Sequence, residues 1–175
     1  VDTSSRAAVT AAYREGYLLN LLAPQRWTGD VVTCQRGTIG ADYAAFASDY
    51  RILTRANIAC ARDFGMDQLS CISDPYRETH GFGSTIEYMT DGPPRSSHPL
   101  QDHKDLSRLA RPDATRSARM LDRINAVETY YDAFRGEYSI LGWVEGPAAE
   151  AADLRGVTTF MMDCFDDEAF VCDLM

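Results

Sequence analysis

Charged residues follow each of three strand-like segments of the chain, at the point where the segment ends. Arg36 follows the first segment, Asp74 the second and Glu145 the third. If these strands are parallel, their carboxyl ends meet at one edge of the sheet, and the three side chains converge there. A cation beside carboxylates can position a substrate and move protons. The alternative is that each acid only caps the loop or helix after it.

Further polar and aromatic residues adjoin these strand ends. Arg77 and Glu78 come just beyond Asp74, and Trp143 stands two residues before Glu145. We assign Asp74 and Glu145 as the catalytic candidates, and we assign substrate binding to the residues Arg36, Arg77, Glu78 and Trp143. For Trp143 the sequence leaves two alternatives, a place in the core or a place in the wall of a pocket.

The sequence predicts no metal site within this chain. Structural and catalytic zinc sites need three or four Cys, His or carboxylate ligands at compatible spacing. The five cysteines show no C-x-x-C spacing and fall mostly inside predicted helices or strands. With no secretion signal in the sequence, they are expected to be reduced thiols of a cytoplasmic protein.

The periodicity of apolar residues predicts the elements that must position these side chains. Strands are predicted at 31–34, 67–73 and 139–144, with an extra short strand at 85–89. Helices are predicted at 5–23, 42–64, 102–109, from 112 to a stop at 136, at 148–154 and at 158–175. Parallel strands joined by long helices indicate an α/β fold. Three main strands cannot close a barrel, so the chain forms either a small open sheet or the first part of a larger structure.

Length and charge restrict the class of protein. A chain of 175 residues indicates one domain. Its net charge of −9 would repel a nucleic-acid backbone or an anionic membrane, so neither is expected as a partner. No run of apolar residues reaches the length of a membrane span.

Two segments resemble the uroporphyrinogen decarboxylase superfamily. The first runs Phe-Gly-Met-Asp-Gln-Leu-Ser-Cys-Ile-Ser-Asp-Pro from Phe64, followed by Gly-Phe-Gly at 81–83 and Asp-Gly-Pro-Pro at 91–94. The second runs Ile-Leu-Gly-Trp-Val-Glu-Gly-Pro from Ile140. The resemblance implies that residues 1–175 are a single domain, the N-terminal half of a (β/α)8 TIM barrel, with a helical extension over about residues 1–30.

Within the superfamily, the segment Thr-Phe-Met-Met-Asp-Cys-Phe-Asp-Asp-Glu-Ala-Phe-Val from Thr159 resembles the corrinoid methyltransferase branch. Asp74 matches the aspartate that contacts the pyrrole nitrogens in the decarboxylases. Their arginine-rich run after the first strand is here Gln-Arg-Gly-Thr-Ile-Gly, with Arg36 alone. Their substrate-facing tyrosine falls near Asp153. Both departures weaken decarboxylation as the activity.

The resemblance therefore implies a methyltransferase of a corrinoid-dependent methyl-transfer or demethylation system. Its corrinoid would be carried by a partner protein, and its small-molecule partner would be a methyl donor or acceptor. Any zinc would be held by ligands outside this chain. Two alternatives stay open: a uroporphyrinogen-type decarboxylase, and a non-catalytic half-barrel subunit that a second chain or another copy of itself completes.

Overall fold

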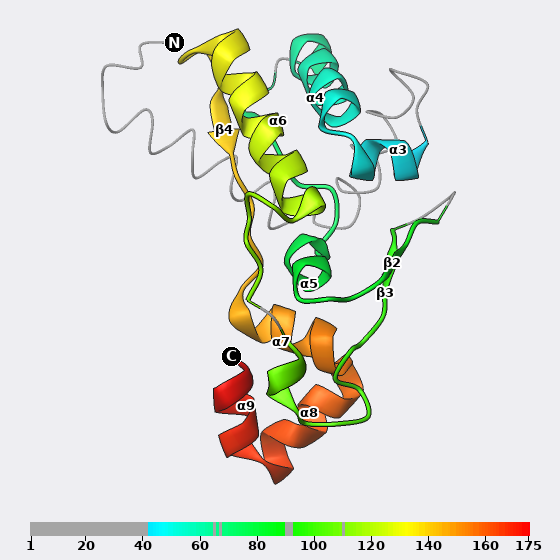
Figure 1. Cartoon of the computed structure of the whole chain (residues 1–175). Helices are drawn as coiled ribbons and strands as arrows, with labels where there is room; N and C mark the ends of the chain where they lie inside the picture. Colours follow the sequence, from blue (N-terminus) through cyan, green and yellow to red (C-terminus); the bar gives the residue numbers. More distant parts are fainter. Residues whose placement is uncertain (1–41, 65, 67, 90–92, 110) are drawn as a thin grey trace, which may run out of the picture.

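The computed structural model describes residues 42–64, 66, 68–89, 93–109 and 111–175, and these form an α/β fold (Figure 1). Its elements are α3 (Tyr43–Ser48), α4 (Tyr50–Phe64), β1 (Gln68–Ser70), α5 (Arg77–Gly81), β2 (Ile86–Glu87), β3 (Arg95–Ser96), the 3-10 turn η1 (Leu106–Arg108), α6 (Ala118–Phe134), β4 (Ser139–Leu141), α7 (Pro147–Arg155), α8 (Val157–Asp166) and α9 (Glu168–Leu174). Among these residues no helix is both long enough and apolar enough to cross a bilayer. The strand predicted at 31–34 and the helix predicted at 5–23 lie outside the described residues.

Strands β1 and β4 form a parallel pair, and Figure 1 shows β4 beside α6 in the upper part of the molecule. Leu69 is in register with Ile140, and Cys71 N–H extends the ladder by donating to the carbonyl of Leu141 at 3.1 Å. This confirms the prediction of parallel strands within 67–73 and 139–144, and it shows in addition that the two are neighbours. The described strands do not form a closed barrel.

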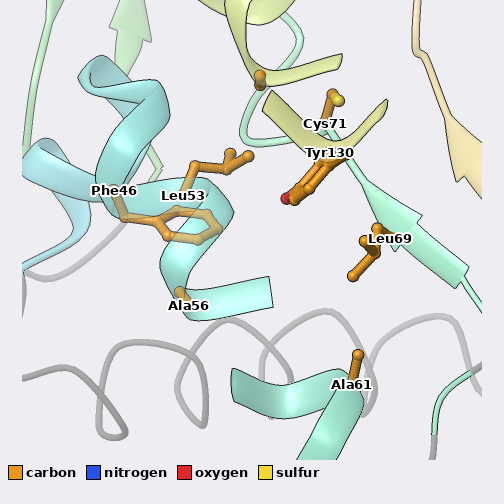
Figure 2. Packing of buried hydrophobic residues seen from close by; sticks show 8 residues of the cluster. Phe46, Leu53, Ala56, Ala61, Leu69, Cys71 and Tyr130 are labelled. Carbon is orange, nitrogen blue, oxygen red and sulfur yellow. The ribbon is translucent and has the colours of Figure 1, made fainter. Parts of the chain in front are cut away.

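Helices α4 and α6 cover this strand pair and supply most of its hydrophobic core (Figure 2). The buried members of the core are Phe46, Leu53, Ala56, Ala61, Leu69, Cys71, Ala126 and Tyr130. The Tyr130 hydroxyl donates to the carbonyl of Ser70 at 3.1 Å, so this polar group has a hydrogen-bond partner although the residue is buried in the core.

One face of α6 carries both apolar and charged residues. Arg119, Arg123, Ala126 and Tyr130 are its buried residues, and their spacing of four, three and four places them on one side of a helix. The C-terminal half of this face joins the core. The N-terminal half directs two arginines at the residues that follow β1.

The helix predicted at 42–64 is two helices, because Asp49 has extended backbone dihedrals between them. The Asp49 carboxylate accepts from Arg51 N–H at 2.8 Å, and Asp122 accepts from Tyr50 N–H at 2.9 Å. These two acids satisfy amide groups at the start of α4 that a helix leaves without intrahelical partners. One of the two is supplied from α6, so periodicity within 42–64 could not have predicted the break.

Elsewhere the elements differ from the prediction mainly in length. The strand predicted at 85–89 is β2, and it pairs in antiparallel fashion with β3, which was not predicted. The helix predicted at 102–109 is the 3-10 turn η1. The helix predicted at 158–175 divides into α8 and α9 at Asp167, whose carboxylate accepts from Phe170 N–H at 3.2 Å and caps α9.

The three C-terminal helices are tied to the segment before η1 by Arg155. Its Nε donates to Asp163 at 2.6 Å, and its Nη1 donates to the carbonyls of Leu100, Gln101 (2.9 Å) and His103 (3.2 Å). The guanidinium is almost fully buried. Arg155 therefore acts as a hydrogen-bonded link between two segments about fifty residues apart.

Candidate active site

Asp74 lies in the loop after β1, four residues beyond the last strand residue Ser70 and just before Pro75, and both oxygens of its carboxylate accept hydrogen bonds. Oδ2 accepts from Arg119 Nη2 at 2.6 Å and from the Ser73 hydroxyl at 2.8 Å, and Oδ1 accepts from Tyr76 N–H at 3.1 Å. The side chain has no exposed surface. Charge-assisted bonds of this length hold the carboxylate in one orientation.

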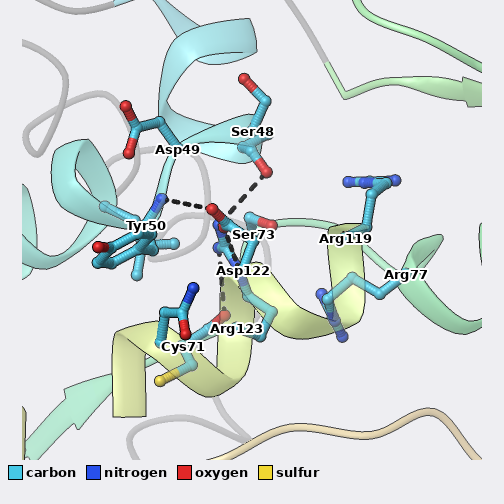
Figure 3. Close-up of polar contacts among 12 residues, drawn as sticks. Ser48, Asp49, Tyr50, Cys71, Ser73, Arg77, Arg119, Asp122 and Arg123 are labelled. Atoms are coloured by element: carbon cyan, nitrogen blue, oxygen red, sulfur yellow. Dashed lines mark hydrogen bonds and ion pairs between the residues drawn. The ribbon is translucent and has the colours of Figure 1, made fainter. Parts of the chain in front are cut away.

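Three arginines from two helices converge on the segment that follows β1 (Figure 3). Arg77, at the start of α5, donates to the carbonyl of Asp74, and Arg119 pairs with its carboxylate. Arg123 donates to the carbonyl of Cys71 at 3.5 Å and pairs with Asp122. We refer to Arg77, Arg119 and Arg123 as the arginine cluster.

Arg77 differs from the other two because part of its guanidinium is unsatisfied. The residue is 2% exposed, and its Nη2 is buried with no hydrogen-bond partner among the described residues. Its Nε lies 4.0 Å from Glu78 Oε2. Burial is the main cause that lowers the pKa of Arg77, and Glu78 and Asp74 oppose it. A buried N–H without an acceptor is costly, so this atom is suited to receive an anionic oxygen of a ligand.

At the end of β4, Trp143 and Glu145 form a hydrogen-bonded pair. Trp143 Nε1 donates to Glu145 Oε1 at 2.7 Å, and Trp143 is 43% exposed. Of the two alternatives for Trp143, a place in the core is therefore wrong. The strand ends at Leu141, three residues earlier than predicted, and the pair lies in the loop leading to α7.

Glu150 lies on α7, on the side that packs against α5. It is 8% exposed, and its Oε2 accepts from the Thr79 hydroxyl of α5 at 2.9 Å. The pKa of Glu150 is raised to about 7, with burial as the largest cause. The Thr79 hydrogen bond opposes the rise, and the charges of Glu78, Asp153 and Glu145 add to it. A carboxyl of this pKa exchanges its proton near neutral pH.

The structure brings the candidates predicted from the sequence together in two groups. Asp74, Arg77 and Glu78 are in contact after β1, and Trp143 is bonded to Glu145 after β4. The effect of both Glu78 and Glu145 on the pKa of Glu150 places the two groups within electrostatic reach of α7. Arg36 lies outside the described residues.

Sequence reasoning missed Arg119, Arg123 and Glu150. The first two are four residues apart and in phase with Ala126 and Tyr130, so charge on the apolar face of a helix was the available signal. Glu150 offered a weaker signal, since it stands alone in the alanine-rich start of α7.

Comparisons with known proteins concern nearly the whole chain. Residues 22–175 match the family model described as uroporphyrinogen decarboxylase (URO-D). Among solved structures, the chain is similar to a "methyltransferase from Methanosarcina mazei", with 19% sequence identity and a TM-score of 0.72. The alignment covers 80% of this chain and 42% of that one, so the chain spans less than half the length of that structure. At this identity the likeness shows the fold alone. No curated protein sequence matches the chain.

Proposed function

Because the chain belongs to the uroporphyrinogen decarboxylase family, we propose that it is part of a methyltransferase that acts in corrinoid-dependent methyl transfer or demethylation. The residues of this chain would form the first part of a (β/α)8 barrel, with the arginine cluster, Trp143 and Glu145 at the carboxyl ends of its strands. TIM-barrel enzymes place their active sites at that end of the barrel.

The state of Asp74 is the observation that carries this proposal. By resemblance, a decarboxylase would need this carboxylate to contact the pyrrole nitrogens of its substrate. Here both oxygens are occupied by Arg119, Ser73 and the Tyr76 amide. Breaking a buried ion pair costs about 3–5 kcal/mol, so Asp74 is poorly suited to turn toward a substrate. This argues against the decarboxylase alternative.

Two resemblances supply the second line of support. The similar solved structure is described as a methyltransferase, and the segment 159–171 resembles the methyltransferase branch. Both resemblances, one in structure and one in sequence, favour methyl transfer over decarboxylation.

In this proposal the residues have distinct roles. Arg77 would bind an anionic oxygen of the substrate through its unpartnered Nη2. Asp74 is a positioning residue, because its backbone carbonyl accepts from Arg77 and its carboxylate fixes Arg119. Glu145 would be the acid or base, with its orientation set by the indole N–H of Trp143.

The cofactors that the family implies do not all fit the described residues. No three His, Cys, Asp or Glu side chains among them are grouped so as to hold a metal ion. We therefore derive no step from zinc at this site, and any zinc would have its ligands in other residues of the protein. The corrinoid would be bound by a partner protein that docks at the barrel mouth.

The test is a methyl-transfer assay on the full-length protein with methylcobalamin, combined with metal analysis. We expect Arg77→Met to lower kcat/KM about tenfold to a hundredfold, because a charged hydrogen bond to substrate is lost. Arg51→Met, at a 73% exposed side chain, is the matched control.

Two results would contradict the proposal. One is a protein without zinc that leaves methylcobalamin unchanged. The other is release of carbon dioxide from uroporphyrinogen, which would support the decarboxylase alternative. A chain that self-associates and is inactive in both assays would support the non-catalytic half-barrel subunit.

A further inference from the structure

Four carboxylates gather where α5, α7 and the loop after β4 approach one another. They are Glu78 on α5, Glu145 in the loop, and Glu150 and Asp153 on α7. Glu78, Asp153 and Glu145 each raise the pKa of Glu150, and Glu145 also raises that of Asp153, so Glu150 is within electrostatic reach of the other three. We refer to these four residues as the acidic cluster.

The positive charge near this cluster does not neutralise it. Arg77 Nε is 4.0 Å from Glu78, and the charge of His98 lowers the pKa of Asp153. Among the described residues, no ion pair joins Glu145 or Glu150 to an arginine or a lysine. The cluster therefore has an excess of negative charge in a site that is partly shielded from water.

Two oxygens of the acidic cluster are also left without a hydrogen-bond donor. Glu150 is more than nine-tenths buried, and while Oε2 is bonded to Thr79, Oε1 is buried with no hydrogen-bond partner among the described residues. Glu78 Oε2 is buried and has no hydrogen-bond partner either. Two buried acceptors without donors are costly in a folded protein, and the charge of a cation placed against them would offset part of that cost.

The neighbouring groups indicate what kind of cation fits. The described residues contain no grouping of three His, Cys, Asp or Glu with the geometry to hold a metal ion. The indole of Trp143 is held beside the cluster by its N–H bond to Glu145 at 2.7 Å, and the residue is 43% exposed. An aromatic face next to carboxylates attracts alkylated ammonium groups through cation–π contact and charge together.

We propose that the acidic cluster and Trp143 form a binding site for a small organic ammonium cation, with Glu150 as its central carboxylate. This inference rests on the proposed function for its role, since the cation would be the charged end of the small substrate. The binding itself does not depend on methyl transfer. A ligand with an anionic oxygen as well could also reach Arg77, which adjoins Glu78.

The experiment is isothermal titration calorimetry of the full-length protein with two probes of the same shape. Choline is the cation, and 3,3-dimethylbutan-1-ol is its neutral analogue, in which carbon replaces nitrogen. We expect choline to bind about tenfold more tightly than the alcohol, because only the cation is attracted by the carboxylates and by the indole ring.

Three variants test whether choline binds at the acidic cluster and Trp143. Glu150→Gln keeps the shape and the Thr79 hydrogen bond, and it should weaken choline binding about tenfold without changing binding of the alcohol. Glu128→Gln, an exposed acid on α6, removes the same charge elsewhere and should have no effect. If Glu150→Gln does not fold, Trp143→Leu at the exposed indole tests the aromatic part of the site.

Equal binding of the two probes would overturn the inference, and so would choline binding that neither Glu150→Gln nor Trp143→Leu weakens. Specific choline binding by a protein inactive with methylcobalamin would remove the proposed function and leave the site. Methyl transfer by a protein with no preference for choline would overturn the binding site and leave the proposed function standing.

Discussion

The buried pair of Asp74 and Arg119 gives the sharpest test of how the site is built. In Arg119→Met the guanidinium is lost, and with it the 2.6 Å contact to Asp74, the 3.2 Å bond to the carbonyl of Tyr76 and the contact with the Tyr88 ring at 5.4 Å. Asp74 keeps only two neutral donors in a site with no exposed surface. We expect a loss of about 3–5 kcal/mol in the free energy of unfolding.

Urea unfolding followed by circular dichroism measures this loss. With a slope of about 2 kcal/mol per molar urea, the midpoint should fall by about 2 M. In the double variant Asp74→Leu with Arg119→Met no charge is left unpaired, so it should lose much less than the sum of the two single variants. The control Arg51→Met breaks an exposed pair at 3.7 Å and should cost under about 1 kcal/mol. A loss below about 1 kcal/mol in Arg119→Met, or strictly additive losses, would refute the reasoning.

Three further predictions concern other parts of the molecule. Arg155→Met should cost about 3–5 kcal/mol in urea unfolding, whereas Arg135→Met, at a 73% exposed side chain, should cost almost nothing. The raised pKa of Glu150, about 7, means that the folded state binds its proton more tightly than the unfolded state. Stability should therefore fall by about 2–3 kcal/mol from pH 4.5 to pH 8, and Glu150→Gln should remove this slope. Burial raises the pKa of Cys71 to about 11, so iodoacetamide at pH 8 should label exposed Cys164 well before Cys71 by peptide mass spectrometry.

Local rules predicted which residues follow the strands, although β1 and β4 both end three residues earlier than predicted. Pro75 excludes helical geometry at Asp74, so the acid was expected at the end of a strand, and it lies in the loop that follows β1. The glycine and proline at 146 and 147 likewise predicted the start of α7. Such signals depend on residues next to each other in the sequence, which is why they can be found without a structure.

The arginine cluster could not be predicted in the same way, because its partners are far apart in the sequence. Arg119 lies 45 residues from Asp74, and Arg123 lies 52 residues from Cys71. Periodicity places both arginines on the buried face of α6 but does not say which strand end that face meets. The packing of α6 against α5 and β4 decides this, and it changes Asp74 from an acid available to a substrate into one half of an ion pair.

The two charged groups of the site are connected through α5. This helix has five residues, and its first two supply Arg77 to the arginine cluster and Glu78 to the acidic cluster. It is fixed at one side by the bond from Arg77 to the carbonyl of Asp74 and at the other by the bond from Thr79 to Glu150. A ligand that drew Glu150 away from Thr79 would therefore release one attachment of α5 and alter the position of Arg77. Occupation of the acidic cluster should for this reason change the affinity of the arginine cluster for an anion, and by linkage the converse should hold to the same degree.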